Sequence, residues 1–131
     1  MEAILVKDQK AAAFVMEDGT FEGVYRITEK VCGDVEQVTG VRPKIINWQG
    51  ELQPAQVYVA TLGNSEMSEA IAEEEGIELS SLWGKRECFL FQVLKNGSLL
   101  IAGSDKRGTI YGLFHISELM GVSPFVHFAD V

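Results

Sequence analysis

The sequence has little positive charge and no long apolar run, and both shortages narrow what the protein can be. Lysine and arginine together number 11 against 19 aspartates and glutamates, which gives a formal charge of −8. We therefore expect no basic face that could neutralise a nucleic-acid backbone, and no attraction to an anionic membrane surface. The longest apolar runs, such as residues 99–102, are far shorter than the roughly 20 residues that span a bilayer. The predicted partners thus include no nucleic acid and no membrane.

Cysteine is also scarce. Cys32 and Cys88 are the only two, and they lie far apart in apolar surroundings. Two such thiols make neither a disulfide framework nor the thiolate set of a structural zinc site. We predict that both are buried, unpaired thiols.

The length fits one domain. A chain of 131 residues with 47% hydrophobic content can bury a substantial core but leaves little room for a second domain. Its last ten residues, 122–131, form an apolar, strand-like segment, whereas natural chain ends are usually polar and frayed. We therefore expect residues 1–131 to be a single domain that is part of a longer polypeptide.

Strand-like and helix-like patterns alternate along the chain. Strands are predicted at 3–6, 12–16, 44–48, 57–60, 88–94 and 99–102, from short apolar runs bounded by polar residues. Apolar residues at steps of three and four predict a helix from Phe21, with an N-cap at Asp18 or Thr20 and a C-cap at Gly40. Two further helices are predicted, one after residues 62–65 that ends at Gly76 and one after the polar turn 104–108 that Gly121 closes.

The connections decide the fold class. Asn96-Gly97 between the last two predicted strands is a strong hairpin signal, so at least one strand pair should be antiparallel. The alternation of helices and strands otherwise resembles an α/β protein. We predict an α+β fold in which helices pack on a mixed β-sheet, and not a doubly wound Rossmann sheet.

One predicted helix carries a run of acids. They occupy its polar side and the residues just beyond: Glu66, Glu69, Glu73, Glu74, Glu75 and Glu78. The run lacks the spaced oxygen ligands and the turn glycine of an EF-hand calcium loop. We interpret it as a solvated face.

A polar turn before the last helix is the strongest candidate for a binding function: Ser104, Asp105, Lys106 and Arg107. It lies between Gly103 and Gly108, and the start of a helix offers free backbone N–H groups to an anion. The glycine spacing imitates a phosphate-binding P-loop. Thr109 stands where that loop needs its lysine, however, and Ile110 where it needs the magnesium-binding hydroxyl.

The same turn also has an interpretation without any ligand. The two glycines would let the backbone turn, and Ser104 or Asp105 would cap the helix. Lys106 and Arg107 would be solvated or paired with acids. The sequence leaves both interpretations open.

No catalytic constellation is present. His115 and Glu118 begin the zinc-protease pattern H-x-x-E-H, but Leu119 replaces its second histidine, and His127 is the only other histidine. A nucleophile elbow is absent, Cys88 has no histidine nearby in sequence, and the glutamates have no reason to differ in pKa as glycosidase acids do. We predict no catalytic residue, no metal and no cofactor. A small hydrolase that uses the two histidines and Glu118 is the weakest hypothesis.

The last third of the chain carries a family resemblance. Residues 101–113 read IAGSDKRGTIYGL, and they continue with ISE at 116–118, GVSP at 121–124 and ADV at 129–131. This pattern resembles the N-terminal domain of glycoside hydrolase family 115, the xylan α-1,2-glucuronidases. Residues 59–65 and 83–87 resemble it more loosely, and FVHF at 125–128 departs from the aromatic-rich stretch of the family.

The resemblance implies a fold similar to the N-terminal domains of β-N-acetylhexosaminidases and α-glucuronidases, which is zincin-like without the metal centre. It implies that the catalytic acids lie in a (β/α)8 barrel that follows this domain, so that this chain alone is not an enzyme. The partners would be that barrel and, through it, a xylan-type polysaccharide that loses (4-O-methyl)glucuronic acid.

Under that resemblance the polar turn would face the barrel or the rim of its substrate cleft. A turn at the carboxyl end of a strand is where open α/β sheets meet ligands, and Arg107 is suited to binding a carboxylate. The alternative function is a free-standing module that binds a small anion or sugar at the turn between Gly103 and Gly108.

Overall fold

The structure, a computed structural model, describes residues 3–4, 6–7, 10–17, 20–63, 65–122 and 127–128. Its centre is a five-stranded sheet with the strand order β5-β4-β6-β8-β7. The strands are β4 (Phe14–Met16), β5 (Ile45–Asn47), β6 (Val57–Thr61), β7 (Phe89–Val93) and β8 (Leu99–Gly103). Strands β5, β4, β6 and β8 are parallel, and β7 runs antiparallel to β8 at one edge. The sheet is therefore mixed, as predicted.

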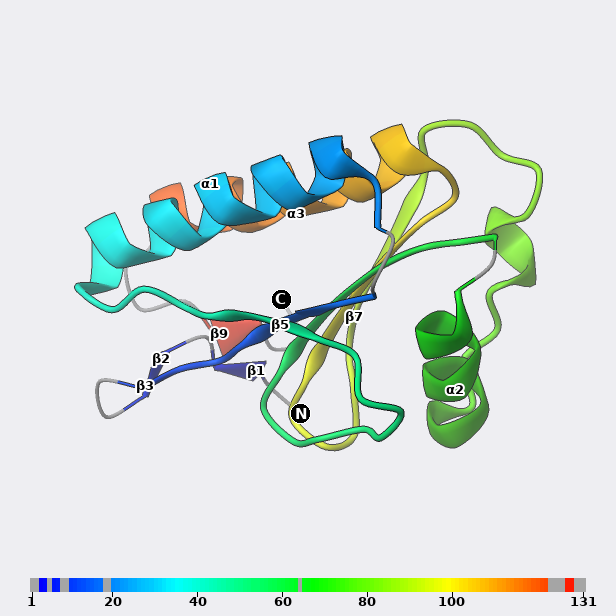
Figure 1. The fold of residues 1–131 in the computed structure, drawn as a ribbon, viewed down its shortest axis with the longest axis horizontal. Helices are drawn as coiled ribbons and strands as arrows, with labels where there is room; N and C mark the ends of the chain where they lie inside the picture. Colours follow the sequence, from blue (N-terminus) through cyan, green and yellow to red (C-terminus); the bar gives the residue numbers. More distant parts are fainter. Residues whose placement is uncertain are drawn as a thin grey trace.

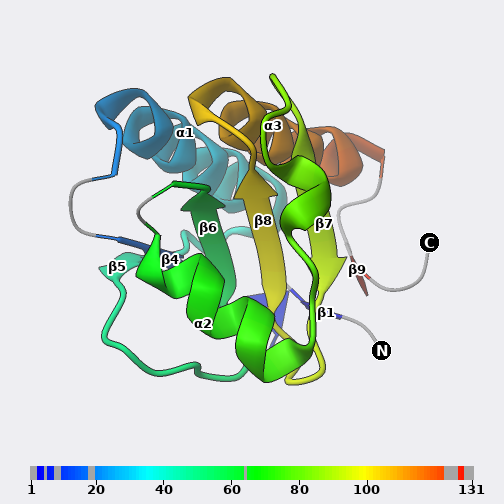
Figure 2. The ribbon, with the colours of Figure 1, turned by 90° about the vertical axis from the view of Figure 1, so that its right-hand side faces the viewer.

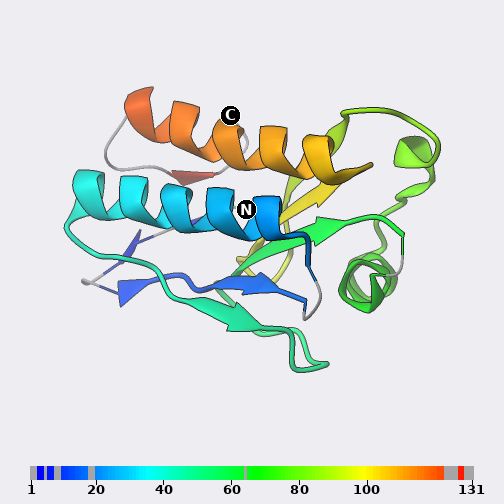
Figure 3. The same ribbon diagram turned by 45° about the horizontal axis from the view of Figure 1, so that its top comes forward.

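Helices cover both faces of this sheet. Helices α1 (Glu22–Thr39) and α3 (Lys106–Val122) lie side by side on one face (Figures 1 and 3). Helix α2 (Glu66–Glu75) and the 3-10 turn η1 (Ser80–Leu82) lie on the other, in front of β6 and β8 in Figure 2. The predicted α+β class is thus confirmed. No helix in the described part of the chain is long and apolar enough to cross a membrane.

Strand β6 shows how the two faces are filled. Its side chains alternate: Val57 and Val59 join the core under α1 and α3, whereas Tyr58 and Ala60 join the core on the α2 side. All four are buried, as is usual for a central parallel strand with helices on both faces.

Two small antiparallel pairs lie beside the sheet. Strand β1 (Ala3–Ile4) pairs with β9 (His127–Phe128), and β2 (Val6–Lys7) pairs with β3 (Lys10–Ala11). The first pair brings segments from the two ends of the sequence together (Figure 2). Part of the strand-like segment predicted at 122–131 is therefore a strand; residues 123–126 and 129–131 lie outside the described residues.

The turn signals are confirmed where glycine meets a positive φ. Gly40 and Gly76 end α1 and α2 in the left-handed region, with φ values of 82° and 67°. The Asn96-Gly97 hairpin joins β7 to β8, and the amide of Leu94 donates to the carbonyl oxygen of Ser98 across it at 2.8 Å.

Two helix ends were predicted wrongly. The N-cap of α1 is Phe21 and not Thr20, because the Thr20 hydroxyl donates to the carbonyl oxygen of Glu17 instead of capping the helix. Asp18, the other predicted cap, lies outside the described residues. Gly121 does not close α3, which continues to Val122, since a glycine permits a left-handed turn without requiring one.

Candidate functional site

The polar turn 104–107 lies at the carboxyl edge of the parallel strands. It follows β8 directly, and α3 begins within it at Lys106. Glu17 follows β4 at the same edge, and Ser65, which caps α2, follows β6. The turn thus follows a strand, as the sequence pattern predicts, at the edge where open α/β sheets usually hold ligands.

The turn is fastened to the residues that precede β7. The amide of Ser104 donates to the carbonyl oxygen of Cys88 at 2.8 Å, and the amide of Cys88 donates to the Ser104 hydroxyl at 3.0 Å. The amide of Glu87 donates to Oδ2 of Asp105 at 3.0 Å. Glu87 has a φ of 56°, an unusual value for a side-chain-bearing residue, and these contacts hold it there.

Asp105 is the helix cap that the sequence left undecided between two residues. Its Oδ1 accepts a hydrogen bond from the amide of Gly108 at 2.8 Å, whereas the Ser104 hydroxyl accepts one from the amide of Cys88. The hydrogen bonds from the amides of Gly108 and Glu87 lower the pKa of the Asp105 carboxyl below its ordinary value. The Asp105 carboxylate therefore places a negative charge at the start of α3, where the backbone N–H groups would otherwise favour an anion.

The two basic residues of the turn differ in their contacts. Arg107 pairs with Glu87 across 2.8 Å, and both side chains remain largely exposed. That hydrogen bond raises the pKa of Arg107. Lys106 lies against Gly23 at the start of α1, where an added Cβ would come within 2.9 Å of Cε of the lysine. Contact of these residues with a barrel or a substrate stays a prediction.

The two glycines that flank the turn allow close packing. A Cβ on Gly108 would lie 2.0 Å from the carbonyl oxygen of Cys88, and one on Gly103 would lie 2.2 Å from the amide nitrogen of Thr109. Only glycine lets α3 start this close to β7 and β8. The spacing that imitates a P-loop therefore has a packing cause.

Thr109 is a residue whose role the sequence did not predict. It is buried, and its hydroxyl lies 2.6 Å from the hydroxyl of Thr61 and 3.1 Å from the carbonyl oxygen of Ala60. These contacts tie the first turn of α3 to the end of β6. The only signal in the sequence was a hydroxyl-bearing residue between Gly108 and Ile110, near the start of the helix.

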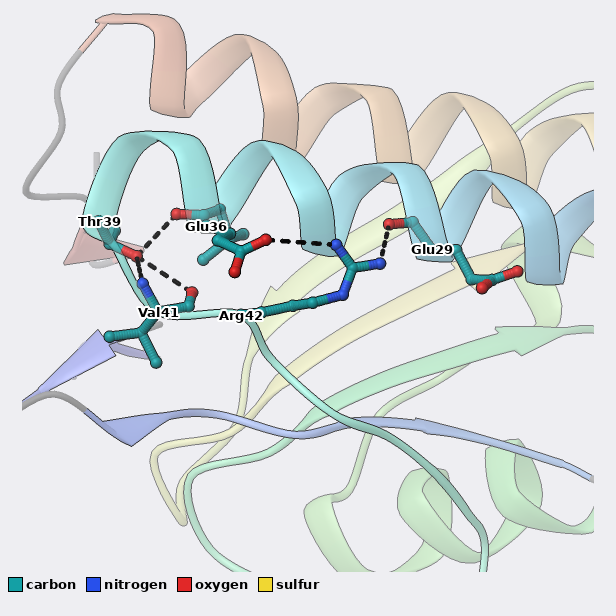
Figure 4. A network of polar contacts seen from close by, with 6 residues as sticks. Glu29, Glu36, Thr39, Val41 and Arg42 are labelled. Atoms are coloured by element: carbon teal, nitrogen blue, oxygen red, sulfur yellow. Dashed lines mark hydrogen bonds and ion pairs between the residues drawn. The ribbon is translucent and has the colours of Figure 1, made fainter.

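The described surface is hollowed in at least two places. One, of about 260 Å³, lies between α2 and η1 and reaches Trp83. The other, of about 420 Å³, lies between α1 and β5, with Cys32, Tyr25 and Arg42 in its lining. Figure 4 shows how Arg42 closes over α1: its guanidinium lies 3.6 Å from Oε1 of Glu36 and donates to the carbonyl oxygen of Glu29 at 3.3 Å.

The cysteines are not equivalent. Cys32 is 1% exposed, and burial raises the pKa of its thiol to about 11, so the thiol stays protonated at neutral pH and is not an activated nucleophile. Cys88 is only half-buried, which makes the prediction of burial wrong for this residue. It starts the segment next to exposed loop 83–87, and its Sγ lies 3.3 Å from the carbonyl oxygen of Arg86.

The metal hypothesis gains nothing from the geometry. The His115 ring packs against Phe91 and Phe89, with ring centroids 4.8 and 5.8 Å away, and Glu118 is exposed. Among the described residues, no group of three or more histidine, cysteine, aspartate or glutamate side chains is placed to hold a metal ion. The side chain of His127 lies outside the described part.

The acidic residues around α2 are mostly solvated, as interpreted from the sequence. Glu66, Glu69, Glu73 and Glu74 are exposed. Glu75, in contrast, accepts a hydrogen bond from the amide of Lys95 at 2.6 Å. Helix α2 ends at Glu75, so Glu78 lies beyond it.

The solved structures that match this chain include a glycoside hydrolase. No protein-family model matches the chain. No curated protein matches it either. A solved structure described as a novel family GH115 4-O-methyl-α-glucuronidase, BtGH115A, with specificity for decorated arabinogalactans, is similar to it with a TM-score of 0.67 and 30% sequence identity. The match covers 86% of this chain and 14% of that enzyme.

The match supports the resemblance at a coarse level. The chain is similar in fold and sequence to a segment of a GH115 glycoside hydrolase, and it spans only 14% of the length of that enzyme. It is therefore a glycoside hydrolase-related module.

Proposed function

We propose that this chain is a non-catalytic N-terminal domain of a glycoside hydrolase of the α-glucuronidase type. In this role it supports a (β/α)8 barrel that removes (4-O-methyl)glucuronic acid from a polysaccharide such as xylan. The observation that carries the proposal is the match of 86% of this chain to only 14% of a GH115 enzyme. The dense packing of the polar turn against residues 87–88, together with the lack of a metal-binding cluster among the described residues, fits a supporting role.

Two polysaccharides are candidates for the substrate of the longer protein. The name of the similar enzyme refers to decorated arabinogalactans, whereas the sequence resemblance points to xylan. Both share the sugar acid that is released. The experiment therefore offers both glucuronoxylan and glucuronate-decorated arabinogalactan.

The test compares two proteins. One is the 131-residue chain, and the other is the longer polypeptide read from the same gene past Val131. We expect no release of (4-O-methyl)glucuronic acid by the chain and measurable release by the longer protein. Turnover by the purified chain, or a reading frame that stops at Val131, would overturn the proposal.

A further inference from the structure

The hollow between α2 and η1 combines an exposed aromatic ring with polar groups that have no partner. Trp83 directly follows η1 and is 60% exposed, more than any other large hydrophobic side chain among the described residues. It lines the hollow together with apolar side chains, among them Leu62 and Leu79. An exposed tryptophan on the rim of an apolar hollow provides a flat apolar surface that is partly open to solvent.

The polar lining divides into occupied and unoccupied groups. The Ser65 hydroxyl donates to Glu17, and the Ser68 hydroxyl donates to the carbonyl oxygen of Ser65 at 3.1 Å. The carboxylate of Glu69 and the hydroxyl of Ser80 also line the hollow, and neither has a hydrogen-bond partner among the described residues. The hollow therefore presents one strong acceptor and one hydroxyl to a ligand.

The floor of the hollow is rigid. Leu79 and Leu82, on either side of Ser80, are buried in the core on the α2 side of the sheet. Met67 and Ile71 anchor α2 in the same core. Trp83, Ser80 and Glu69 are thus carried by elements that the core holds in place, which reduces the entropy lost when a ligand binds.

Size and charge narrow the ligand class. A volume of about 260 Å³ is below the roughly 300–1,000 Å³ typical of pockets for drug-sized molecules, and it suits one small ring. Glu66 and Glu73 flank Glu69 on the exposed side of α2, so the α2 side of the hollow is negative and disfavours a sugar acid there. A single aromatic surface is also not the cage that encloses a quaternary ammonium ion.

We propose that this hollow binds one neutral pyranose ring of a polysaccharide, with the apolar C–H face of the ring on Trp83 and its hydroxyl groups on Glu69 and Ser80. The module would then hold the chain of a polysaccharide at a place distinct from the reacting sugar acid. This site does not depend on the proposed α-glucuronidase role, because its residues bind sugar whether or not a barrel follows.

The test follows the indole N–H signals of the 131-residue chain by NMR during titration with xylohexaose and with a neutral β-galactan oligosaccharide. Trp48, the other tryptophan, packs on Tyr58 with ring centroids 6.1 Å apart and does not line the hollow, so its signal is an internal control. We expect the Trp83 signal to shift with a dissociation constant on the order of 1 mM while the Trp48 signal stays. Oligogalacturonate and tetramethylammonium should bind at least about tenfold more weakly.

Matched variants separate the hollow from the rest of the surface. Trp83→Ala should abolish the binding, whereas Phe21→Ala, which removes another exposed aromatic residue, should leave it unchanged. Glu69→Gln should weaken binding several-fold, whereas Glu73→Gln, on the same helix but outside the hollow, should not.

Three results would overturn the proposal: no shift with either neutral oligosaccharide, equal binding by Trp83→Ala, or preferred binding of tetramethylammonium or oligogalacturonate. Because Trp83 and Glu69 are exposed, both variants should keep the thermal midpoint of the wild type, and Glu69→Gln decides the matter if Trp83→Ala does not fold. Failure here leaves the proposed supporting role intact, since that role is tested by release of the sugar acid.

Discussion

The hydroxyl oxygen of Thr109 lies 2.6 Å from the hydroxyl oxygen of Thr61, 48 residues earlier in the chain. Thr109 also reaches the carbonyl oxygen of Ala60 at 3.1 Å and that of Asp105 at 3.2 Å. A helix that starts immediately after a strand is in this way tied to the neighbouring strand. The polar turn is fixed by hydrogen bonds from Thr109 to Asp105, from Cys88 to Ser104 and from Glu87 to Asp105.

Replacing Thr109 by valine keeps the volume but removes the hydroxyl group. Because the site is buried, we expect Thr109→Val to lower the free energy of unfolding by about 1–2 kcal/mol in urea denaturation. Thr39→Val, which loses a hydroxyl at the half-exposed end of α1, should cost less. Equal losses in the two variants would contradict the importance given to the Thr61–Thr109 contact.

Gly108→Ala tests whether the glycine spacing serves packing. The added Cβ would lie 2.0 Å from the backbone oxygen of Cys88, so we expect a loss of about 3 kcal/mol or more, at the upper end for overpacked sites. Gly33→Ala is the control: it lies inside α1, and its new Cβ would meet only the flexible end of Arg42 at 3.3 Å. Chemical denaturation should show Gly33→Ala neutral or more stable than the wild type. Similar losses for both glycines would be evidence against close packing as the cause.

Asp105→Asn tests the charge at the start of α3. The pKa of Asp105 is lowered in the folded state, so its contribution to stability is present above the unfolded-state pKa and is lost as the pH falls below about 4. Asparagine remains a good helix cap. We therefore expect the variant to melt a few degrees below the wild type at pH 7 and to approach it as the pH is lowered.

The control for that experiment is Glu73→Gln, which removes one exposed negative charge from α2. A gap between wild type and Asp105→Asn that does not narrow at acid pH would show that the carboxylate is not the stabilising group.

The two cysteines should react differently with a thiol reagent. In the native protein at pH 8 we expect one thiol per chain, that of Cys88, to react quickly, and both to react after unfolding. Cys88→Ser should abolish the fast reaction and Cys32→Ala should preserve it. Fast labelling of two native thiols would contradict the burial of Cys32.

The raised pKa of Cys32 also predicts a dependence on alkaline pH. Between about pH 9 and pH 11 the unfolded thiol loses its proton while the folded one keeps it, so stability falls over that range. A pKa that rises from 9.0 to about 11 corresponds to a loss of roughly 3 kcal/mol once the thiol is deprotonated in both states. Comparing the wild type with Cys32→Ala by denaturation at pH 8 and pH 10.5 isolates this group, because every other titrating residue is shared.

Arg107→Ala in the longer protein tests the contact predicted for the polar turn. We expect lower activity or weaker domain association, with little change in the thermal midpoint of the isolated chain, because the Arg107–Glu87 pair is exposed. Glu87→Gln breaks the same pair and serves as the control. If the two variants behave alike, Arg107 acts only through Glu87.

Local patterns predicted much of this fold. The hairpin at Asn96-Gly97 and the helix ends at Gly40 and Gly76 depend on a few neighbouring residues whose backbone preferences are strong, and these predictions were confirmed. The start of α1 was not predictable in the same way, because Thr20 has a competing acceptor in the carbonyl of Glu17.

The candidate site shows the same division. Its location after β8 followed from the strand–turn–helix pattern, which also predicted a helix cap at Ser104 or Asp105; the structure assigns that cap to Asp105. The partners Glu87 and Cys88 were not predicted, because the hairpin signal indicates that β7 pairs with β8 but does not state the register, which sets Phe89 opposite Gly103 and so brings these two residues to the turn.

The sequence by itself determined the α+β class, the order of the main elements and the acidic character of the chain, because periodicity, turn chemistry and composition are local or additive properties. Only the tertiary structure decided that β4 lies between β5 and β6, that Gly108 is a packing contact, and that Trp83 and Glu69 share one hollow. Each of these depends on residues from different segments of the chain that become neighbours only in the folded protein. Such tertiary contacts depend on how the two faces of the sheet bury their side chains, and no pattern within one segment predicts them.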